Sequence, residues 1–287
     1  MNPDSQFETH RTRLFALAYR LLGSRSDGDD LVQDAWLRWQ AADHTTIRDP
    51  QAWLITVTTR LGLDRLRAAR SSRIDYIGPW LPEPLQVIDA APDPAAQQEN
   101  DEQISLALLA LLERLGPEER AAFLLKEAFD YDYARIAQML GHSESGCRQW
   151  VHRARTRLRT GRSRFAATPE QHRQLLHQFM LASQSGDHDA IVALLTINAR
   201  LISDGGGQVR AALRPLHGAE RIARLYAAIA RRSLTLPARL GQVNGEPAIL
   251  RFNQHHRLTA ITLIVIEEGR ITDVLNLMNP NKLPSMG

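Results

Sequence analysis

Apolar side chains recur at helical spacing through residues 7–129, with polar residues between them. The first such segment ends at Gly23, a residue that readily stops a helix. We expect the next helix to begin at Ser26, with Asp29 three residues later as its capping-box partner. The spacing predicts a series of helices over residues 7–22, 26–39, 51–73, 104–115 and 118–129.

Residues 132–159 predict two further helices joined by a tight turn. Gly141 can adopt the left-handed conformation that ends the first helix, and Ser143 can cap the second. The second helix has one apolar stripe, formed by Cys147, Val151, Ala154 and Leu158. Its other faces carry Ser145, Arg148, Gln149, His152, Arg153, Arg155, Arg157 and Arg159.

A short helix, a turn containing glycine and a basic amphipathic helix are typical of a helix-turn-helix that enters the major groove. The alternative is an arginine-rich surface helix of an ordinary helical domain. The turn and the excess of arginine together favour DNA binding.

The pattern changes after residue 165. Thr168 is expected to cap a helix whose first residue is Pro169, with Gln171 as the capping-box partner. The segments that follow predict helices over 170–184, 188–195 and 218–231, and strands over 199–203, 235–243, 247–253, 257–266 and 270–277. Asn244-Gly245 and Glu268-Gly269 provide the hairpin turns. Helices followed by a curled antiparallel sheet predict an α+β cone.

Composition and charge add a linker to this plan. The chain has 287 residues and a net charge of only +3, but residues 74–103 carry no Lys or Arg, seven acidic residues and five prolines. This composition indicates an extended, self-repelling linker. Within it, Trp80, Leu81, Pro82, Glu83 and Pro84 are unusual. An exposed Trp-Leu pair lowers solubility, which favours docking of this segment over a plain linker.

Two other helices carry candidate binding faces. In residues 51–73, Arg60, Asp64 and Arg67 lie on one face, either as a basic surface or as an internal ion-pair network around Asp64. Residues 27–39 combine acidic residues with Trp36 and Trp39, which serve either the core or an interface.

Cys147 is the only cysteine, so no disulfide framework is possible. The N-terminal residues lack the apolar run of a signal peptide, and no apolar stretch is long enough to span a bilayer. We therefore expect a cytoplasmic protein without a membrane partner.

Residues 7–165 resemble an extracytoplasmic-function sigma factor. The segments DDLVQDAWLRW, DPQAWLITVTTRLGLDRLRAARSSR and ERLGPEERAAFLLKEAFDYDYARIAQMLGHSESGCRQWVHRARTRLR carry the resemblance, in this order and spacing. It implies a subunit that binds core RNA polymerase, through its β′ and β subunits, and promoter DNA. The implied polymerase contacts are Asp30, Gln33, Asp34, Trp36 and Arg38. Arg60, Asp64 and Arg67 would face the −10 element.

The resemblance assigns the second helix of the turn motif to the −35 element. Ser145, Arg148, Gln149, His152 and Arg153 would face bases or backbone. Arg155 and Arg157, with Arg159, lie nearer the end of the helix and are expected to contact phosphates, which position a protein without specifying sequence.

Three segments resemble the SigJ-like subgroup, in which a SnoaL-like domain is fused to the sigma factor. They are WLPEP at 80–84, DGGG at Asp204, Gly205, Gly206 and Gly207, and NPNKL at Asn279, Pro280, Asn281, Lys282 and Leu283. The subgroup usually has Lys at position 208 and Asp at position 281, where this chain has Gln208 and Asn281. These motifs imply contacts between domains that control activity, and the loss of two charges would weaken such contacts.

The resemblance implies two all-α sigma domains followed by an α+β SnoaL-like, ketosteroid-isomerase-like cone. The expected domains are residues 1–73, a linker over 74–103, a helix-turn-helix domain over 104–165 and the cone over 168–287. No cofactor, metal or separate anti-sigma factor is expected to be needed, and the free protein is expected to be monomeric.

Two other functional classes compete with this interpretation. Such cones often hold small polyketides or steroids and use Asp or His as a general base, for which Asp204, His255, His256 and Asp273 are candidates. They form no dyad at a diagnostic spacing, so binding of a small effector is favoured over turnover, and catalysis is not expected. A DNA-binding repressor that acts without polymerase is disfavoured by the Trp-rich acidic helix at 27–39.

Overall fold

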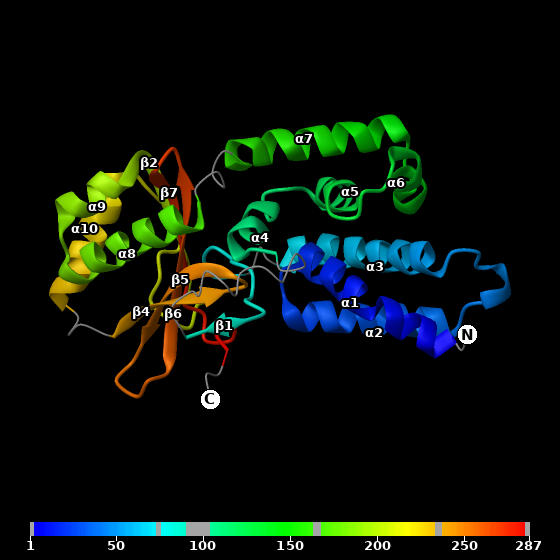
Figure 1. Cartoon of the computed structure of the whole chain (residues 1–287), viewed down its shortest axis with the longest axis horizontal. Coiled ribbons are helices and arrows are strands. Elements are labelled where there is room, and N and C mark those ends of the chain that lie inside the picture. Colours follow the sequence, from blue (N-terminus) through cyan, green and yellow to red (C-terminus); the bar gives the residue numbers. More distant parts are fainter. Residues whose placement is uncertain (1–2, 73–75, 90–103, 163–167, 233–236, 285–287) are drawn as a thin grey trace. The chain divides into compact units, whose positions relative to one another are not determined.

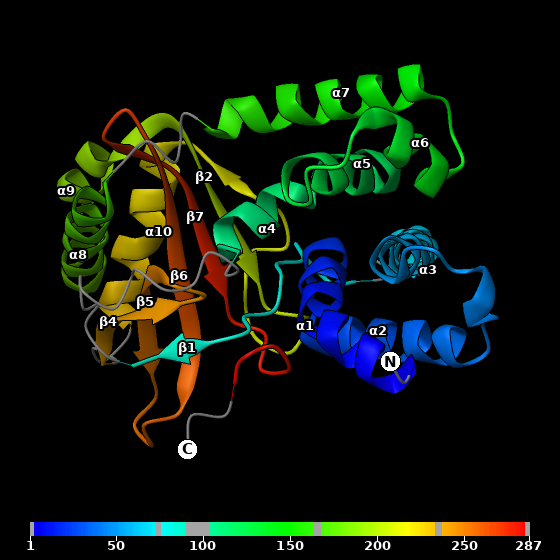
Figure 2. The same ribbon diagram turned by 45° about the vertical axis from the view of Figure 1, so that its right-hand side comes forward.

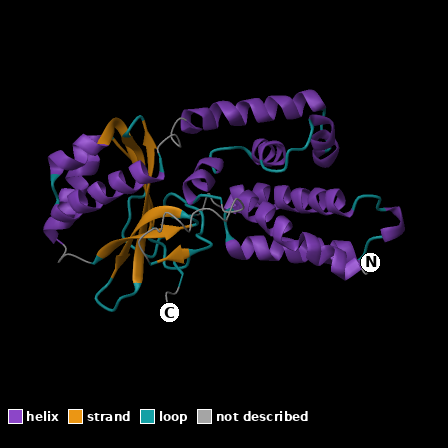
Figure 3. Cartoon of the chain, in the orientation of Figure 1, coloured by secondary structure: helices purple, strands orange, loops and turns teal. Residues whose placement is uncertain are grey.

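A computed structural model describes residues 3–72, 76–89, 104–162, 168–232 and 237–284. The chain divides into two compact units, one of residues 1–74 with 109–159 and one of residues 75–108 with 160–287. Figure 1 labels their elements, and Figure 3 shows that the strands belong to the second unit. None of the helices in the described ranges is long and apolar enough to cross a membrane.

The first helices of the chain pack against one another around a leucine-rich core that includes Leu14, Leu17 and Leu31. They are α1 (Pro3–Leu22), α2 (Arg25–Gln40), the 3-10 helix His44–Thr46 and α3 (Pro50–Ser72). The prediction that Ser26 caps α2 is wrong. The cap is Ser24, whose hydroxyl accepts a hydrogen bond from the Asp27 amide.

The remaining helices before the cone are α4 (Leu106–Leu112), α5 (Pro117–Glu127), α6 (Tyr133–Leu140) and α7 (Glu144–Arg162). The predicted turn is confirmed: Gly141 has φ 65°, and the Ser143 hydroxyl accepts from the Gly146 amide at 3.2 Å. The predicted stripe of α7 is buried at all four positions, Cys147, Val151, Ala154 and Leu158.

The second unit contains α8 (Pro169–Ser185), α9 (His188–Leu194), α10 (Ala219–Arg232) and a sheet. Its strands are β1 (Val87–Ile88), β2 (Leu195–Asp204), β3 (Leu216–His217), β4 (Ala238–Val243), β5 (Glu246–Phe252), β6 (Leu258–Glu267) and β7 (Arg270–Leu277). The predicted capping box of Thr168 and Gln171 is present at the start of α8. Figure 2 shows the three helices gathered over one face of the sheet. Apolar residues of both layers, including Phe179, Ile222 and Val274, form the core between them.

The strands are arranged in the order β1-β4-β5-β6-β7-β2-β3. The expectation of an antiparallel sheet is wrong at one position, because β2 runs parallel to β7. Both strands therefore end at the same edge, where Asp204 is paired with Leu277. This register brings the glycine-rich segment after β2 beside the Asn-Pro segment after β7.

The described part of the linker is bound to the cone. Val87 pairs with Val243 and Ile88 with Gln242, so β1 extends the sheet beyond β4. Leu81, Pro82 and Pro84 are buried. The predicted docking of this segment is therefore confirmed, while residues 90–103 lie outside the described part of the chain.

The glycine of the helix-turn-helix offers a test of backbone strain. A Cβ at Gly141 would meet nothing within 4 Å, so only the positive φ opposes substitution. We expect Gly141→Ala to lower the free energy of unfolding by about 1–2 kcal/mol, and Gly141→Asn to lower it less, because Asn tolerates this conformation. Chemical denaturation of the full chain measures both. Equal losses in the two variants would contradict a conformational cause.

Candidate functional site

The carboxylate of Asp204, at the end of β2, joins several segments of the second unit. It is fully buried. It accepts hydrogen bonds from the Tyr76 hydroxyl at 2.5 Å, the Leu81 amide at 2.8 Å and the Gly206 amide at 3.1 Å. It also pairs with the Lys282 ammonium at 2.7 Å. We call Asp204, Lys282, Asn279, Tyr76 and Leu81 the linker clamp.

Lys282 joins the linker to the carboxylate through several interactions at once. Its Nζ donates to the Leu81 carbonyl oxygen at 2.6 Å and lies 4.0 Å from the centre of the Trp80 ring. The side chain is only 11% exposed. A buried ion pair is favourable only when the remaining hydrogen-bonding groups are also satisfied, and the linker backbone provides those groups here.

The glycine-rich segment allows its neighbours to approach closely. Gly206 and Gly207 have φ values of 59° and 72°, a conformation that other residues rarely adopt. A Cβ at Gly206 would lie 2.3 Å from the Asn279 side chain, and one at Gly207 would lie 2.8 Å from Ile77. Asn279 in turn donates to the Tyr76 hydroxyl at 2.9 Å.

The sequence motifs identified most of this site. Its WLPEP segment, Asp204, the three glycines, Asn279 and Lys282 come together, while Pro280 is exposed and Leu283 half-buried. Tyr76 was missed because no periodic signal marks a lone tyrosine in an irregular segment. Gln208 and Asn281 are both exposed and enter the contacts through their backbone amides. The departures from the subgroup pattern thus lie beside the clamp.

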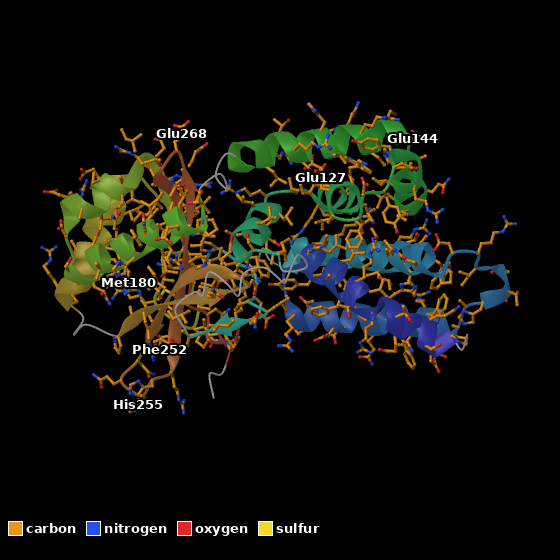
Figure 4. All side chains as sticks on the ribbon, viewed as in Figure 1. Glu127, Glu144, Met180, Phe252, His255 and Glu268 are labelled. Carbon is orange, nitrogen blue, oxygen red and sulfur yellow. The ribbon has the colours of Figure 1, made fainter. Side chains whose placement is uncertain are left out.

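In the first unit, the predicted base-facing residues lie on the exposed side of α7. Ser145, Arg148, Gln149, His152 and Arg153 are all exposed. Arg148 pairs with Glu144 at 3.0 Å and stacks on the Tyr133 ring at 4.8 Å. These contacts orient the guanidinium group at the N-terminal end of α7, where Figure 4 labels Glu144.

The two arginines expected to hold phosphates already have acidic partners. Arg155 donates through Nε and Nη2 to one oxygen of Glu127, at 3.0 and 2.6 Å. Arg157 pairs with the nearly buried carboxylate of Glu119. The side chain of Arg159 lies outside the described part of the chain.

The predicted −10 residues of α3 also make internal contacts. Arg60 donates to the carbonyl oxygens of Met139 at 2.8 Å and Gln138 at 3.0 Å, which lack partners within α6 because they lie at its end. Arg67 pairs with Asp64 at 3.2 Å and with Glu118 at 3.0 Å. The predicted bridge from Asp64 to Arg67 is present, whereas Arg60 bonds elsewhere.

The predicted polymerase-binding residues of α2 lie away from its core. Asp30, Gln33, Trp36 and Arg38 are exposed, and Asp34 pairs with Arg65 at 2.5 Å. Trp39 differs from Trp36: it is buried and packs edge-on against Trp53. Leu37, which the sequence interpretation omitted, is 53% exposed beside Trp36. Their adjacent positions form an apolar spot among charges, the arrangement typical of an interface anchor.

The four candidate catalytic groups do not form a general-base site. Asp204 is held in the clamp, and buried Asp273 pairs with Arg200 of the neighbouring strand. His255 and His256 are exposed in the loop after β5, where Figure 4 labels His255 at the tip. The carboxylates stabilise the fold in this arrangement, and the histidines face solvent.

Known proteins match both parts of the chain. Residues 6–72 match the family described as Sigma-70 region 2, and residues 105–158 match Sigma-70, region 4. The ECF RNA polymerase sigma factor SigJ of Mycobacterium tuberculosis is 37% identical over 97% of this chain and 92% of its own length. The probable ECF RNA polymerase sigma factor SigI of the same organism is 35% identical over 96% and 93%. The crystal structure of the SigJ protein matches with a TM-score of 0.73, at 34% identity and 97% coverage of both chains.

The clamp can be tested by removing either charge. Asp204→Asn or Lys282→Met leaves one buried charge unpaired, so each is expected to weaken linker docking by about 3 kcal/mol. The double variant should lose less than the sum of the two, because no charge is left unpaired. Hydrogen exchange at the Leu81 amide measures docking, with Glu268→Gln as an exposed control. Strictly additive effects would argue against a coupled pair.

Proposed function

The chain belongs to the extracytoplasmic-function sigma factors, which are transcription initiation factors of RNA polymerase and not enzymes. On this premise we propose that its own cone controls when its promoter-reading helices are used. The observation that carries the proposal is the clamp on residues 76–88. These residues lie between the segments that match sigma-70 regions 2 and 4.

The clamp limits the reach of the chain between the two reading regions. While Asp204 and Lys282 hold Tyr76 to Leu81 and β4 holds β1, residues 76–88 form part of the cone. Release of these residues would add about 45 Å of extended chain between the regions. An initiation factor must place its two DNA-reading regions at separate promoter elements. Because the clamp shortens the free chain between these regions, it would control that placement.

For polymerase binding we propose the exposed face of α2. Trp36 and Leu37 would act as the apolar anchor, and Asp30, Gln33, Asp34 and Arg38 would form the charged rim. We assign the β′ subunit to this face and the β subunit to the second reading region. These assignments follow the family, and the exposed apolar pair supports the first of them.

For promoter reading we propose a division of labour along α7. Arg148, Gln149, His152 and Arg153 have exposed donor groups toward the N-terminal half of the helix and would contact the −35 bases. Arg155 and Arg157 would bind phosphates after exchanging their acidic partners Glu127 and Glu119 for DNA. Arg60, Asp64 and Arg67 would lie along the −10 element.

We further propose that the protein works in the cytoplasm as a monomer when free, and that the fused cone makes a separate anti-sigma factor unnecessary. The position of the clamp within the same chain supports the last of these. A regulator covalently attached to its target acts at high effective concentration.

Transcription in vitro with core polymerase tests control by the cone. Lys282→Met should raise promoter output severalfold over the full-length chain, because the linker is released, and truncation after Arg164 should also change it. Glu268→Gln provides the matched surface control. Output identical to the unaltered chain in both altered proteins would refute control in cis.

The salt dependence of DNA binding tests the division along α7. Arg157→Ala should weaken binding to all sequences and reduce the salt slope by about one. Gln149→Ala should instead relax preference at one base and leave the slope unchanged. Binding is measured by fluorescence anisotropy over a range of salt concentrations. A change in sequence preference alone for Arg157→Ala would reverse the assignment.

A further inference from the structure

We propose that the β4–β5 hairpin is a second latch, which holds residues 85–89 of the linker and the first turn of α4 on the cone. The latch consists of Asn244 and Glu246, with Gly241 on the adjoining strand. It deepens the proposed control in cis and rests on it for its effect on transcription. Its contacts are distinct from those of the linker clamp, which holds Tyr76 and Leu81.

Asn244 contacts the chain both before and after residues 87–103. Its Oδ1 accepts from the amides of Leu85 at 2.9 Å and Gln86 at 3.1 Å, and its Nδ2 donates to the Ile104 carbonyl oxygen at 3.3 Å. Its own amide donates to the Gln86 carbonyl oxygen at 3.0 Å. The side chain is buried. One asparagine side chain therefore contacts the chain at Leu85 and Gln86 and again at Ile104.

Glu246 binds the start of α4. Its carboxyl group accepts from the Ala107 amide at 3.4 Å and also interacts with the Ser105 hydroxyl and the Leu106 amide. The Ser105 hydroxyl accepts from the Leu108 amide at 3.0 Å. The first amides of a helix have no partner within it, so these side chains supply the missing acceptors. One of them comes from the cone.

A glycine in β4 leaves room for the linker strand β1. A Cβ at Gly241 would lie 2.5 Å from the Ile88 carbonyl oxygen, so glycine at this position permits β1 to approach β4. Asp89, which follows β1, pairs with Arg239 of β4 at 3.2 Å. The linker is thus attached to one strand and its following turn from residue 85 to residue 89.

These contacts give the latch a function of its own. The region 4 match begins at residue 105, the residue that caps α4. A cone that supplies acceptors to this turn holds the beginning of the −35 reader, in addition to the linker before it. Opening the hairpin contacts would free that beginning while Asp204 and Lys282 still held Leu81.

The latch is also expected to respond to pH. Burial raises the pKa of Glu246 to about 7, and hydrogen bonds from Ser105, Ala107 and Leu106, all neutral groups, oppose the shift. A raised carboxyl pKa means that the closed latch binds a proton more tightly than the open one. The stabilisation is complete below the ordinary pKa of about 4.3 and is lost as the pH rises through about 7.

Asn244→Gly in the full-length protein tests the latch. Asn244 has φ 49° in its turn, a value that glycine adopts freely, so the variant keeps the hairpin and loses only the side-chain contacts. Hydrogen exchange at the amides of Leu85 and Gln86 should become roughly tenfold faster, because both lose their acceptor. Glu268→Gly is the matched control, since Glu268 has the same φ of 49° in the other hairpin turn. Unchanged protection in Asn244→Gly would overturn the latch.

Glu246→Gln addresses the first turn of α4. Glutamine retains an acceptor but does not titrate, so the pH dependence of the protection factors of the Leu106 and Ala107 amides, which are corrected for the intrinsic exchange rate, should disappear. If that dependence persisted, Glu246 would not be part of the latch.

Transcription in vitro separates the latch from the proposed function. The latch predicts altered promoter output for both Asn244→Gly and Lys282→Met. A change with Lys282→Met alone overturns the regulatory role of the latch and leaves control by the cone standing. No change in either variant, together with no change on truncation after Arg164, overturns control by the cone itself.

Discussion

A single buried carboxylate organises the C-terminal half of this sigma factor. Asp204 is fully buried, and its hydrogen-bond partners come from the linker, the glycine-rich loop and the segment after the last strand. A charge in such a position is tolerated only if every partner is present. The carboxylate therefore makes the three segments interdependent. Displacement of any one of them removes a partner from the buried charge, whose desolvation is then no longer offset.

The features that depend on local chemistry were predictable from the sequence. The caps at Thr168 and Ser143, the left-handed Gly141 and the stripe of α7 need information only from neighbouring residues. The error at the start of α2 has the same origin: Ser24 and Ser26 are both good caps, and the periodicity places the boundary only within about two residues.

The features that depend on distant partners were not predictable in this way. Tyr76 meets Asp204 across 128 residues of sequence, and β2 lies parallel to β7. Family motifs marked which segments matter, but only the strand register explains why they meet. The internal partners of Arg155 and Arg157 belong to this class as well, because a basic helix in sequence gives no sign that Glu127 and Glu119 lie against it.

The position of Lys282 near the end of the chain has a consequence during synthesis of the protein. The lysine is synthesised 201 residues after Leu81, whose carbonyl oxygen it binds. The region 4 match ends at residue 158, before Lys282. At ribosomal rates of about 5–20 residues per second, both DNA-reading regions are therefore synthesised roughly six seconds or more before the clamp can close. Each new molecule therefore passes through an interval in which its regulator is incomplete. The order of the chain thus sets a delay between the synthesis of the DNA-reading regions and the closure of the clamp.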